Sequence, residues 1–134
     1  MKTKNELFTF LWIFVLLNYL YCDIVGLMDA TLLKQYLTGK VGGMDITQEF
    51  LLGGGILMEI PIAMILISKF AGFQVNKWSN LGAGLIMSLV QIASLLIGKP
   101  TNYYFFFSII EISTTITICY LSITWKNNTQ NSNN

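Results

Sequence analysis

The chain has 134 residues, of which 54% are hydrophobic and only 11% are charged, and its mean hydropathy is +0.60. A soluble domain of this size must cover a large surface with polar groups, and this composition supplies too few of them. The formal net charge of +1 excludes a strongly basic surface for nucleic acid, and the absence of histidine removes the commonest general base and metal ligand. The composition therefore predicts an integral membrane protein.

Four apolar segments are each long enough to cross a membrane as a helix. Each has at most one charged residue, and they cover residues 7–28, 50–68, 78–98 and 102–125. A helix needs about 20 apolar residues to cross the hydrocarbon core, whereas the strands of a membrane barrel show a shorter, alternating pattern. We therefore expect residues 1–126 to form one all-α domain, an integral membrane four-helix bundle with up-down-up-down topology. The asparagine-rich residues 127–134 predict a disordered polar tail.

The connections between the spans differ in kind. Residues 30–37 predict a short helix on the membrane interface, with leucines on one side and Lys34 and Gln35 on the other. Asp45, with Gln48 three residues later, is expected to cap the second span. Residues 72–77 are expected to form a short loop between the second and third spans.

The lysines are unevenly distributed between the two sides that this topology creates. The side with both termini and the second connection holds five lysines, and the other side holds three. Because loops rich in lysine and arginine stay in the cytoplasm, we expect a multi-pass protein of a bacterial inner membrane with both termini cytoplasmic. Trp12, Trp78 and Trp125 lie near this cytoplasmic side, where interfacial aromatic residues are common.

Three acidic residues lie inside the apolar spans, where charged groups are costly and often functional. Glu59 and Glu111 each lie nine residues into a span, so both are ~14 Å from the same boundary. Asp23 lies closer to that boundary, and no span contains a lysine, arginine or histidine. Because the second and fourth spans are diagonal in such a bundle, we expect Glu59 and Glu111 to meet in a central pocket. At least one of them should then be protonated at neutral pH.

Other polar residues fall on helix faces that are expected to surround this pocket. In the fourth span a polar face has a spacing of three or four residues and comprises Ser108, Glu111, Thr115, Cys119 and Ser122. Gly84, Ser88 and Gln91 repeat this spacing in the third span. We expect Asp23, Asn18, Tyr21 and Gln91 to lie at the rim of the pocket or directly behind its wall. Helix packing is the alternative explanation, because small residues and hydroxyl groups also favour close contacts between membrane helices.

Three segments resemble a family of small bacterial four-span membrane proteins, domain of unknown function 6326. They include NYLYCD at residues 18–23, MEIPIAM at 58–64 and PTNYYFF at 100–106. The resemblance extends over nearly the whole chain except the tail. It implies an integral membrane protein and implies no activity.

The residues leave three functions open. The first is a non-enzymatic membrane protein that binds a small hydrophobic or cationic ligand, or handles protons, at Glu59 and Glu111. The second is a structural or accessory subunit that packs against a partner membrane protein or a further copy of itself. The third is a membrane enzyme that acts on a lipid or a quinone.

The sequence predicts no catalytic residue, no metal site, no cofactor and no nucleic-acid partner. It has neither a P-loop nor a dinucleotide-binding glycine pattern. Cys22 and Cys119 are expected at different depths in the membrane, too far apart for a disulfide.

Overall fold

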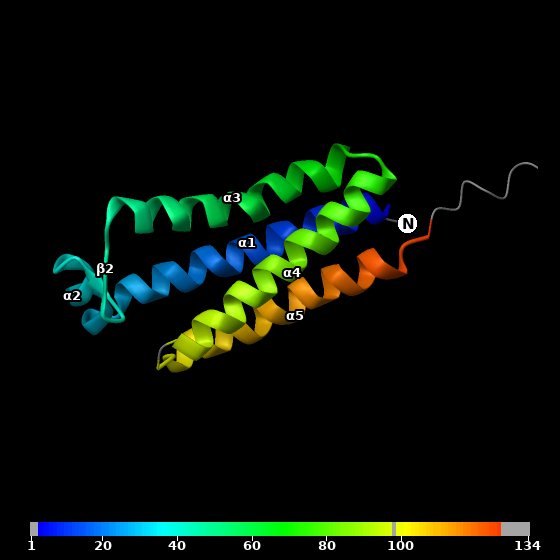
Figure 1. Cartoon of the computed structure of the whole chain (residues 1–134). Helices are drawn as coiled ribbons and strands as arrows, with labels where there is room; N and C mark the ends of the chain where they lie inside the picture. The colour runs from blue at the N-terminus through cyan, green and yellow to red at the C-terminus, as the bar shows by residue number, and fades with distance from the viewer. Residues whose placement is uncertain (1–2, 98, 127–134) are drawn as a thin grey trace, which may run out of the picture.

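Four long helices dominate the computed structural model, which describes residues 3–97 and 99–126 (Figure 1). The long helices are α1 (Lys4–Met28), α3 (Gln48–Phe70), α4 (Phe73–Ile97) and α5 (Asn102–Thr124). Between α1 and α3 lie the short helix α2 (Ala30–Leu37) and the antiparallel strands β1 (Lys40–Val41) and β2 (Met44–Asp45). Within the described residues, four helices are long and apolar enough to cross a membrane. The expected four-helix fold is thus confirmed, while the predicted tail at 127–134 lies outside the described residues.

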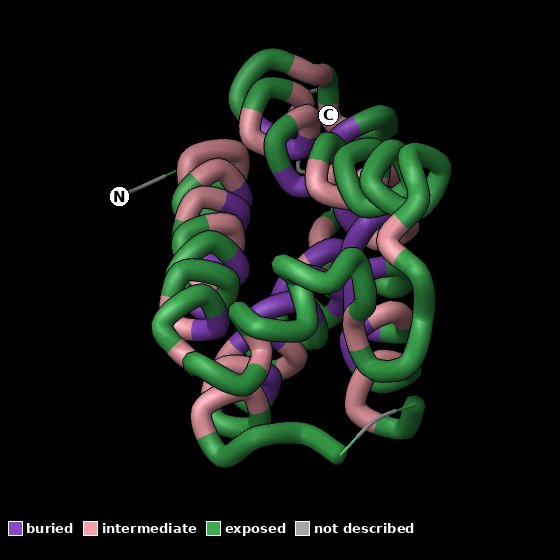
Figure 2. Tube along the Cα trace, turned by 90° about the vertical axis from the view of Figure 1, so that its left-hand side faces the viewer, coloured by how far each residue is buried: buried purple, intermediate pink, exposed green. Residues whose placement is uncertain are grey.

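The four long helices pack in a ring. α1 contacts α3 and α5, and α4 contacts the same two helices, so α3 and α5 are diagonal to each other. We call the end with the start of α1 and the α3–α4 connection the terminal end, and the end with α2 and the strands the hairpin end. Figure 2 shows that buried residues face the interior between the helices.

The helices α1, α2, α3 and α5 begin at threonine or aspartate side chains that accept backbone hydrogen bonds. Thr3 forms a capping box with Glu6 at the start of α1, and Asp29 accepts from two backbone amides at the start of α2. The cap of α3 is Thr47, whose hydroxyl accepts from the Phe50 amide at 3.2 Å, so the expected cap at Asp45 is wrong. Asp45 belongs instead to β2, where it pairs with Lys40.

The expected loop at residues 72–77 is also wrong, because α4 begins at Phe73. Only Ala71 and Gly72 connect α3 to α4. The reason is visible at Asn76, which is fully buried and whose side-chain amide donates to the Ser68 carbonyl at 2.8 Å. A polar residue that finds a partner inside the bundle does not need to remain in a hydrated loop.

A buried polar cluster joins α1, α3 and α4 near the terminal end. The indole of Trp12 donates to the Asn80 side-chain oxygen at 2.6 Å, and Ser68 donates to the same oxygen at 3.2 Å. Trp12, Ser68, Asn76 and Asn80 are all completely buried. Trp12 is therefore a core residue and not the expected interfacial one, whereas Trp78 is exposed.

Hydrogen bonds between side chains connect α4 to α5 along much of their length, and we call these contacts the α4–α5 polar ladder. Its three rungs are Ser94 with the Tyr104 hydroxyl (2.6 Å), the Gln91 amide donating to Ser108 (2.8 Å), and Ser88 with Thr115 (2.7 Å). Further towards the terminal end, Gly84 faces Cys119. The polar faces expected on the third and fourth spans therefore pack against each other.

The close contact at Gly84 gives a test of this packing. A Cβ atom at Gly84 would lie 2.7 Å from the Cys119 sulfur and 3.2 Å from the Thr115 carbonyl oxygen. Gly84→Ala should therefore lower the free energy of unfolding in detergent by about 1–3 kcal/mol. Gly82→Ala is the matched control, because nothing lies within 4 Å of the added Cβ atom. Equal stabilities of the two variants would contradict the described α4–α5 contact.

Candidate functional site

The carboxyl group of Glu111 is buried in the bundle without a hydrogen-bond partner among the described residues. Its side chain is 1% exposed, and neither carboxyl oxygen has a partner. Ser108 and Thr115, one turn away on either side, both belong to the α4–α5 polar ladder. A buried polar group that lacks a partner is costly and rare, so Glu111 is the candidate functional residue of the bundle interior.

Glu111 lines a cavity of about 190 Å³ between the four long helices, which we call the inner cavity. Its apolar lining residues are Leu57, Met58, Met87 and Val90, and its polar ones include Tyr19, Cys22, Asp23, Gln91, Ser94 and Tyr104. The Tyr19 hydroxyl is likewise buried without a partner among the described residues. The cavity therefore combines an apolar wall with two polar groups that are free to contact a bound molecule.

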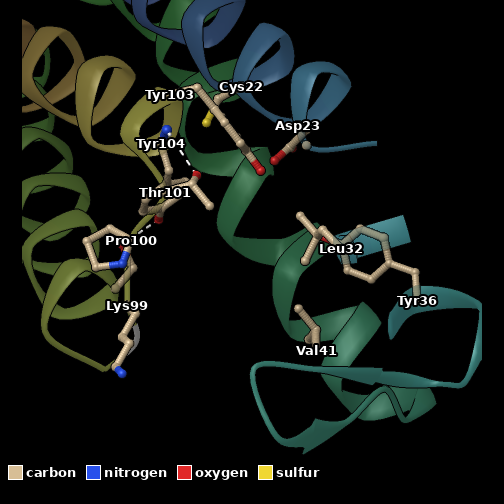
Figure 3. Close-up of a pocket in the computed structure, with 12 residues that line it drawn as sticks. Cys22, Asp23, Leu32, Tyr36, Val41, Lys99, Pro100, Thr101, Tyr103 and Tyr104 are labelled. Atoms are coloured by element: carbon tan, nitrogen blue, oxygen red, sulfur yellow. Dashed lines mark hydrogen bonds between the residues drawn. The ribbon is translucent and has the colours of Figure 1, made fainter. Parts of the chain in front are cut away.

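A second cavity of about 240 Å³, the outer cavity, lies at the hairpin end (Figure 3). It is lined by residues from the end of α1, from α2 and β1, and from the α4–α5 connection. Both cavities share the lining residues Cys22, Asp23, Ser94 and Tyr104, so they adjoin each other. Their volumes together fall within the ~300–1,000 Å³ that is usual for ligand pockets.

The outer cavity is rich in hydroxyl groups and is lined by one acid, Asp23, and one lysine, Lys99. The phenol of Tyr103 reaches toward the Asp23 carboxyl, whereas the Lys99 ammonium group points away from it (Figure 3). Burial raises the pKa of the Tyr36 phenol, and the charge of Asp23 raises this pKa further. Tyr36 thus keeps its hydroxyl proton at neutral pH.

Gly26 allows α2 to lie close over this end of α1. A Cβ atom at Gly26 would lie 3.3 Å from the Leu32 side chain and 3.7 Å from the Tyr103 hydroxyl. The helix expected at residues 30–37 is present as α2, and it contributes Leu32 and Tyr36 to the wall of the outer cavity. The connection between α1 and α3 is therefore part of the site.

The structure brings together three of the six expected site residues. Glu111, Asp23 and Gln91 line the inner cavity. Asn18 and Tyr21 line neither cavity: the Asn18 amide donates to the Phe14 carbonyl in its own helix, and Tyr21 is 60% exposed.

The expectation that Glu59 meets Glu111 in a central pocket is wrong. Glu59 is exposed and does not line the inner cavity. The buried residues of α3 are Pro61, Met64 and Ser68. At 100° per residue, Glu59 lies on roughly the opposite side of the helix from Pro61 and Ser68. The second acid of the inner cavity is Asp23 on α1.

The chain matches the description "Family of unknown function (DUF6326)" over residues 1–132. It belongs to this family. Neither the comparison with curated proteins nor the comparison with solved structures found a match. The DUF6326 description assigns no activity, so the function of this member has to be argued from its site.

Several residues of this DUF6326 site were not expected from the sequence. Tyr19, Ser94 and Tyr104 line the inner cavity. The signal for Tyr19 was its position one helical turn before Asp23, on the same face of α1. No local pattern indicated that Tyr36 would close the outer cavity, because that depends on how α2 folds back over α1.

The two cysteines test whether the cavities can be reached from water. Cys22 lines both cavities, whereas Cys119 contacts Gly84 and its thiol donates to the Leu81 carbonyl. A cationic methanethiosulfonate should modify Cys22 in the Cys119→Ala variant at least ~10 times faster than Cys119 in the Cys22→Ala variant, because acidic clefts concentrate cations. Intact-mass measurement gives both rates. Equal rates for the two cysteines would contradict the greater accessibility of Cys22 through the two cavities.

Proposed function

We propose that this chain is a multi-pass membrane protein that binds a small organic cation in the inner cavity, with Glu111 as the countercharge. The observation that supports this most is the Glu111 carboxyl, which is 1% exposed and whose two oxygens have no partner among the residues that the structure describes. An ionised carboxylate in an apolar interior needs a positive partner. A bound ammonium group supplies that partner, and a proton takes its place when the cation leaves.

The lining of the inner cavity favours a cation over an anion or a neutral molecule. It contains two acidic residues, Glu111 and Asp23, and no lysine or arginine. Tyr19 and Tyr104 add aromatic rings, which attract cations through their faces. The apolar residues of α3 and α4 in the wall suit the hydrocarbon part of the ligand.

The outer cavity gives the ligand a route to Glu111 from the hairpin end. Asp23 lines both cavities and therefore attracts a cation before it reaches Glu111. The lysine distribution favours cytoplasmic termini in a bacterial inner membrane. In that orientation the hairpin end faces the outside of the cell, and the ligand enters from there.

Benzylamine, compared with the neutral benzyl alcohol, tests the proposed cation site. Benzylamine should raise the melting temperature of the purified protein in detergent at pH 8, and benzyl alcohol should raise it much less. The stabilisation should fall as the pH is lowered, because protons compete with the amine for the same carboxylate. Glu111→Gln should weaken benzylamine binding by about 10- to 100-fold, since it removes a charge-assisted hydrogen bond.

Glu59→Gln is the matched control for this experiment, because Glu59 is an acid on a parallel helix that does not line the cavity. It should bind benzylamine like the unmodified protein. Native mass spectrometry of the unmodified protein, Glu111→Gln and Glu59→Gln should agree with these affinities. A bound cation should be missing only from Glu111→Gln. Equal benzylamine affinities of Glu111→Gln and the unmodified protein would overturn the proposal.

A reporter fusion tests the proposed orientation. Alkaline phosphatase is active only outside the cytoplasm, so a fusion after Asn134 should be inactive, and a fluorescent protein at the same position should be bright. A phosphatase fusion between β1 and β2, at Gly42, should be active. The reverse pattern would place the outer cavity on the cytoplasmic side.

A further inference from the structure

Tyr19 carries a buried polar group that has no partner in the part of the chain that the structure describes. Its side chain is 6% exposed, and its hydroxyl oxygen lacks a hydrogen bond, as do the two carboxyl oxygens of Glu111. Tyr19 belongs to α1 and Glu111 to α5, yet both line the inner cavity. Two such exceptions on different helices that meet at one cavity indicate a bound molecule that contacts both of them.

The inward position of Tyr19 follows from the spacing of the buried residues of α1. Trp12, Val15, Tyr19 and Cys22 are separated by three, four and three residues, which places them on one face of the helix. The ring of Tyr19 is part of the main apolar cluster. A buried phenol usually finds a partner for its hydroxyl, and a phenylalanine would fill this place without an unpaired polar group. The hydroxyl therefore needs an explanation that apolar packing does not give.

The other hydroxyl and amide groups in the wall of the inner cavity are engaged within the protein. The Gln91 amide donates across the α4–α5 polar ladder at 2.8 Å, and the hydroxyls of Ser94 and Tyr104 bond to each other at 2.6 Å. The charge of Glu111 acts on the Tyr19 hydroxyl, although no hydrogen bond joins the two side chains. The Tyr19 hydroxyl is thus available to a ligand that Glu111 holds.

We propose that the Tyr19 hydroxyl accepts a hydrogen bond from the bound ammonium group, so that the inner cavity selects primary amines over tertiary and quaternary ones. This inference rests on the cation site proposed above. A primary ammonium group has three N–H donors, so it donates to the Glu111 carboxylate and to Tyr19 at once. A tertiary ammonium group has a single N–H, which the carboxylate takes, and a quaternary one has none. The Tyr19 hydroxyl then stays unpaired, and that loss discriminates between the ligands.

Benzylamine and N,N-dimethylbenzylamine, which are both cations at pH 8, test the role of Tyr19. Calorimetric titration in detergent gives their affinities, and the unmodified protein should bind benzylamine more tightly. Tyr19→Phe keeps the aromatic ring and removes only the hydroxyl. It should weaken benzylamine binding by about fivefold to tenfold, the value of one hydrogen bond. It should change the affinity for N,N-dimethylbenzylamine by less than about twofold, because that ligand has no N–H left for Tyr19.

Tyr104→Phe is the matched control, because Tyr104 also lines the inner cavity but its hydroxyl already bonds to Ser94. This substitution removes one rung of the α4–α5 polar ladder, so it should lower the melting temperature of the ligand-free protein. It should change the affinities for the two amines by the same factor. Tyr19→Phe should instead keep or raise the melting temperature, since it removes a buried hydroxyl that has no partner.

The outcomes separate the role of Tyr19 from the cation site itself. Equal benzylamine affinities of Tyr19→Phe and the unmodified protein, or an equal loss for both amines, would overturn the inference and leave Glu111 as the countercharge. An unmodified protein that binds both amines equally well would also overturn it, as would a lower melting temperature of ligand-free Tyr19→Phe. Full benzylamine affinity in Glu111→Gln would instead remove the cation site, whatever Tyr19→Phe shows.

Discussion

Polar side chains inside a bundle of apolar helices need partners, and the α4–α5 polar ladder supplies those of Ser88, Gln91, Ser108 and Thr115. Gln91 and Ser108 bond to each other across the two helices, as do Ser88 and Thr115. At the terminal end, Asn80 accepts from both Trp12 and Ser68. Among the residues that the structure describes, these contacts leave the Glu111 carboxyl, between two ladder positions, without a hydrogen-bond partner. The Glu111 carboxyl and the Tyr19 hydroxyl are thus exceptions in an otherwise well-satisfied interior, and both line the inner cavity.

The two cavities define the surroundings of the unpaired Glu111 carboxyl. The inner cavity places Glu111 beside apolar side chains and aromatic rings, and the outer cavity places Asp23 on the way to it. α2 completes the outer wall, so the long connection after α1 belongs to the site. The second intramembrane glutamate, Glu59, is a separate feature, because it lies on the outward face of α3.

Much of the fold could be predicted from the sequence, because long apolar segments and spacings of three and four residues are local signals. The polar face from Ser108 to Ser122 was predicted correctly for this reason. The outward position of Glu59 was not predicted correctly. The spacing of polar residues shows which residues share a face of one helix, but it does not show which face turns inward. That is decided by the packing of Pro61, Met64 and Ser68 against the neighbouring helices. Asn76 and Asn80 were missed because the apolar run begins only after Asn76, and their partners Trp12 and Ser68 come from other helices.

Infrared difference spectroscopy of cation binding reports on the Glu111 carboxyl itself and is the sharpest test of its role as the countercharge. Adding benzylamine to the ligand-free protein should remove a carboxylic-acid band and produce carboxylate bands, as the proton gives way to the ammonium group. This change should be lost in Glu111→Gln and retained in Glu59→Gln. A spectrum in which benzylamine leaves the carboxyl bands unchanged, or changes them equally in Glu111→Gln, would contradict the assignment of Glu111 as the countercharge.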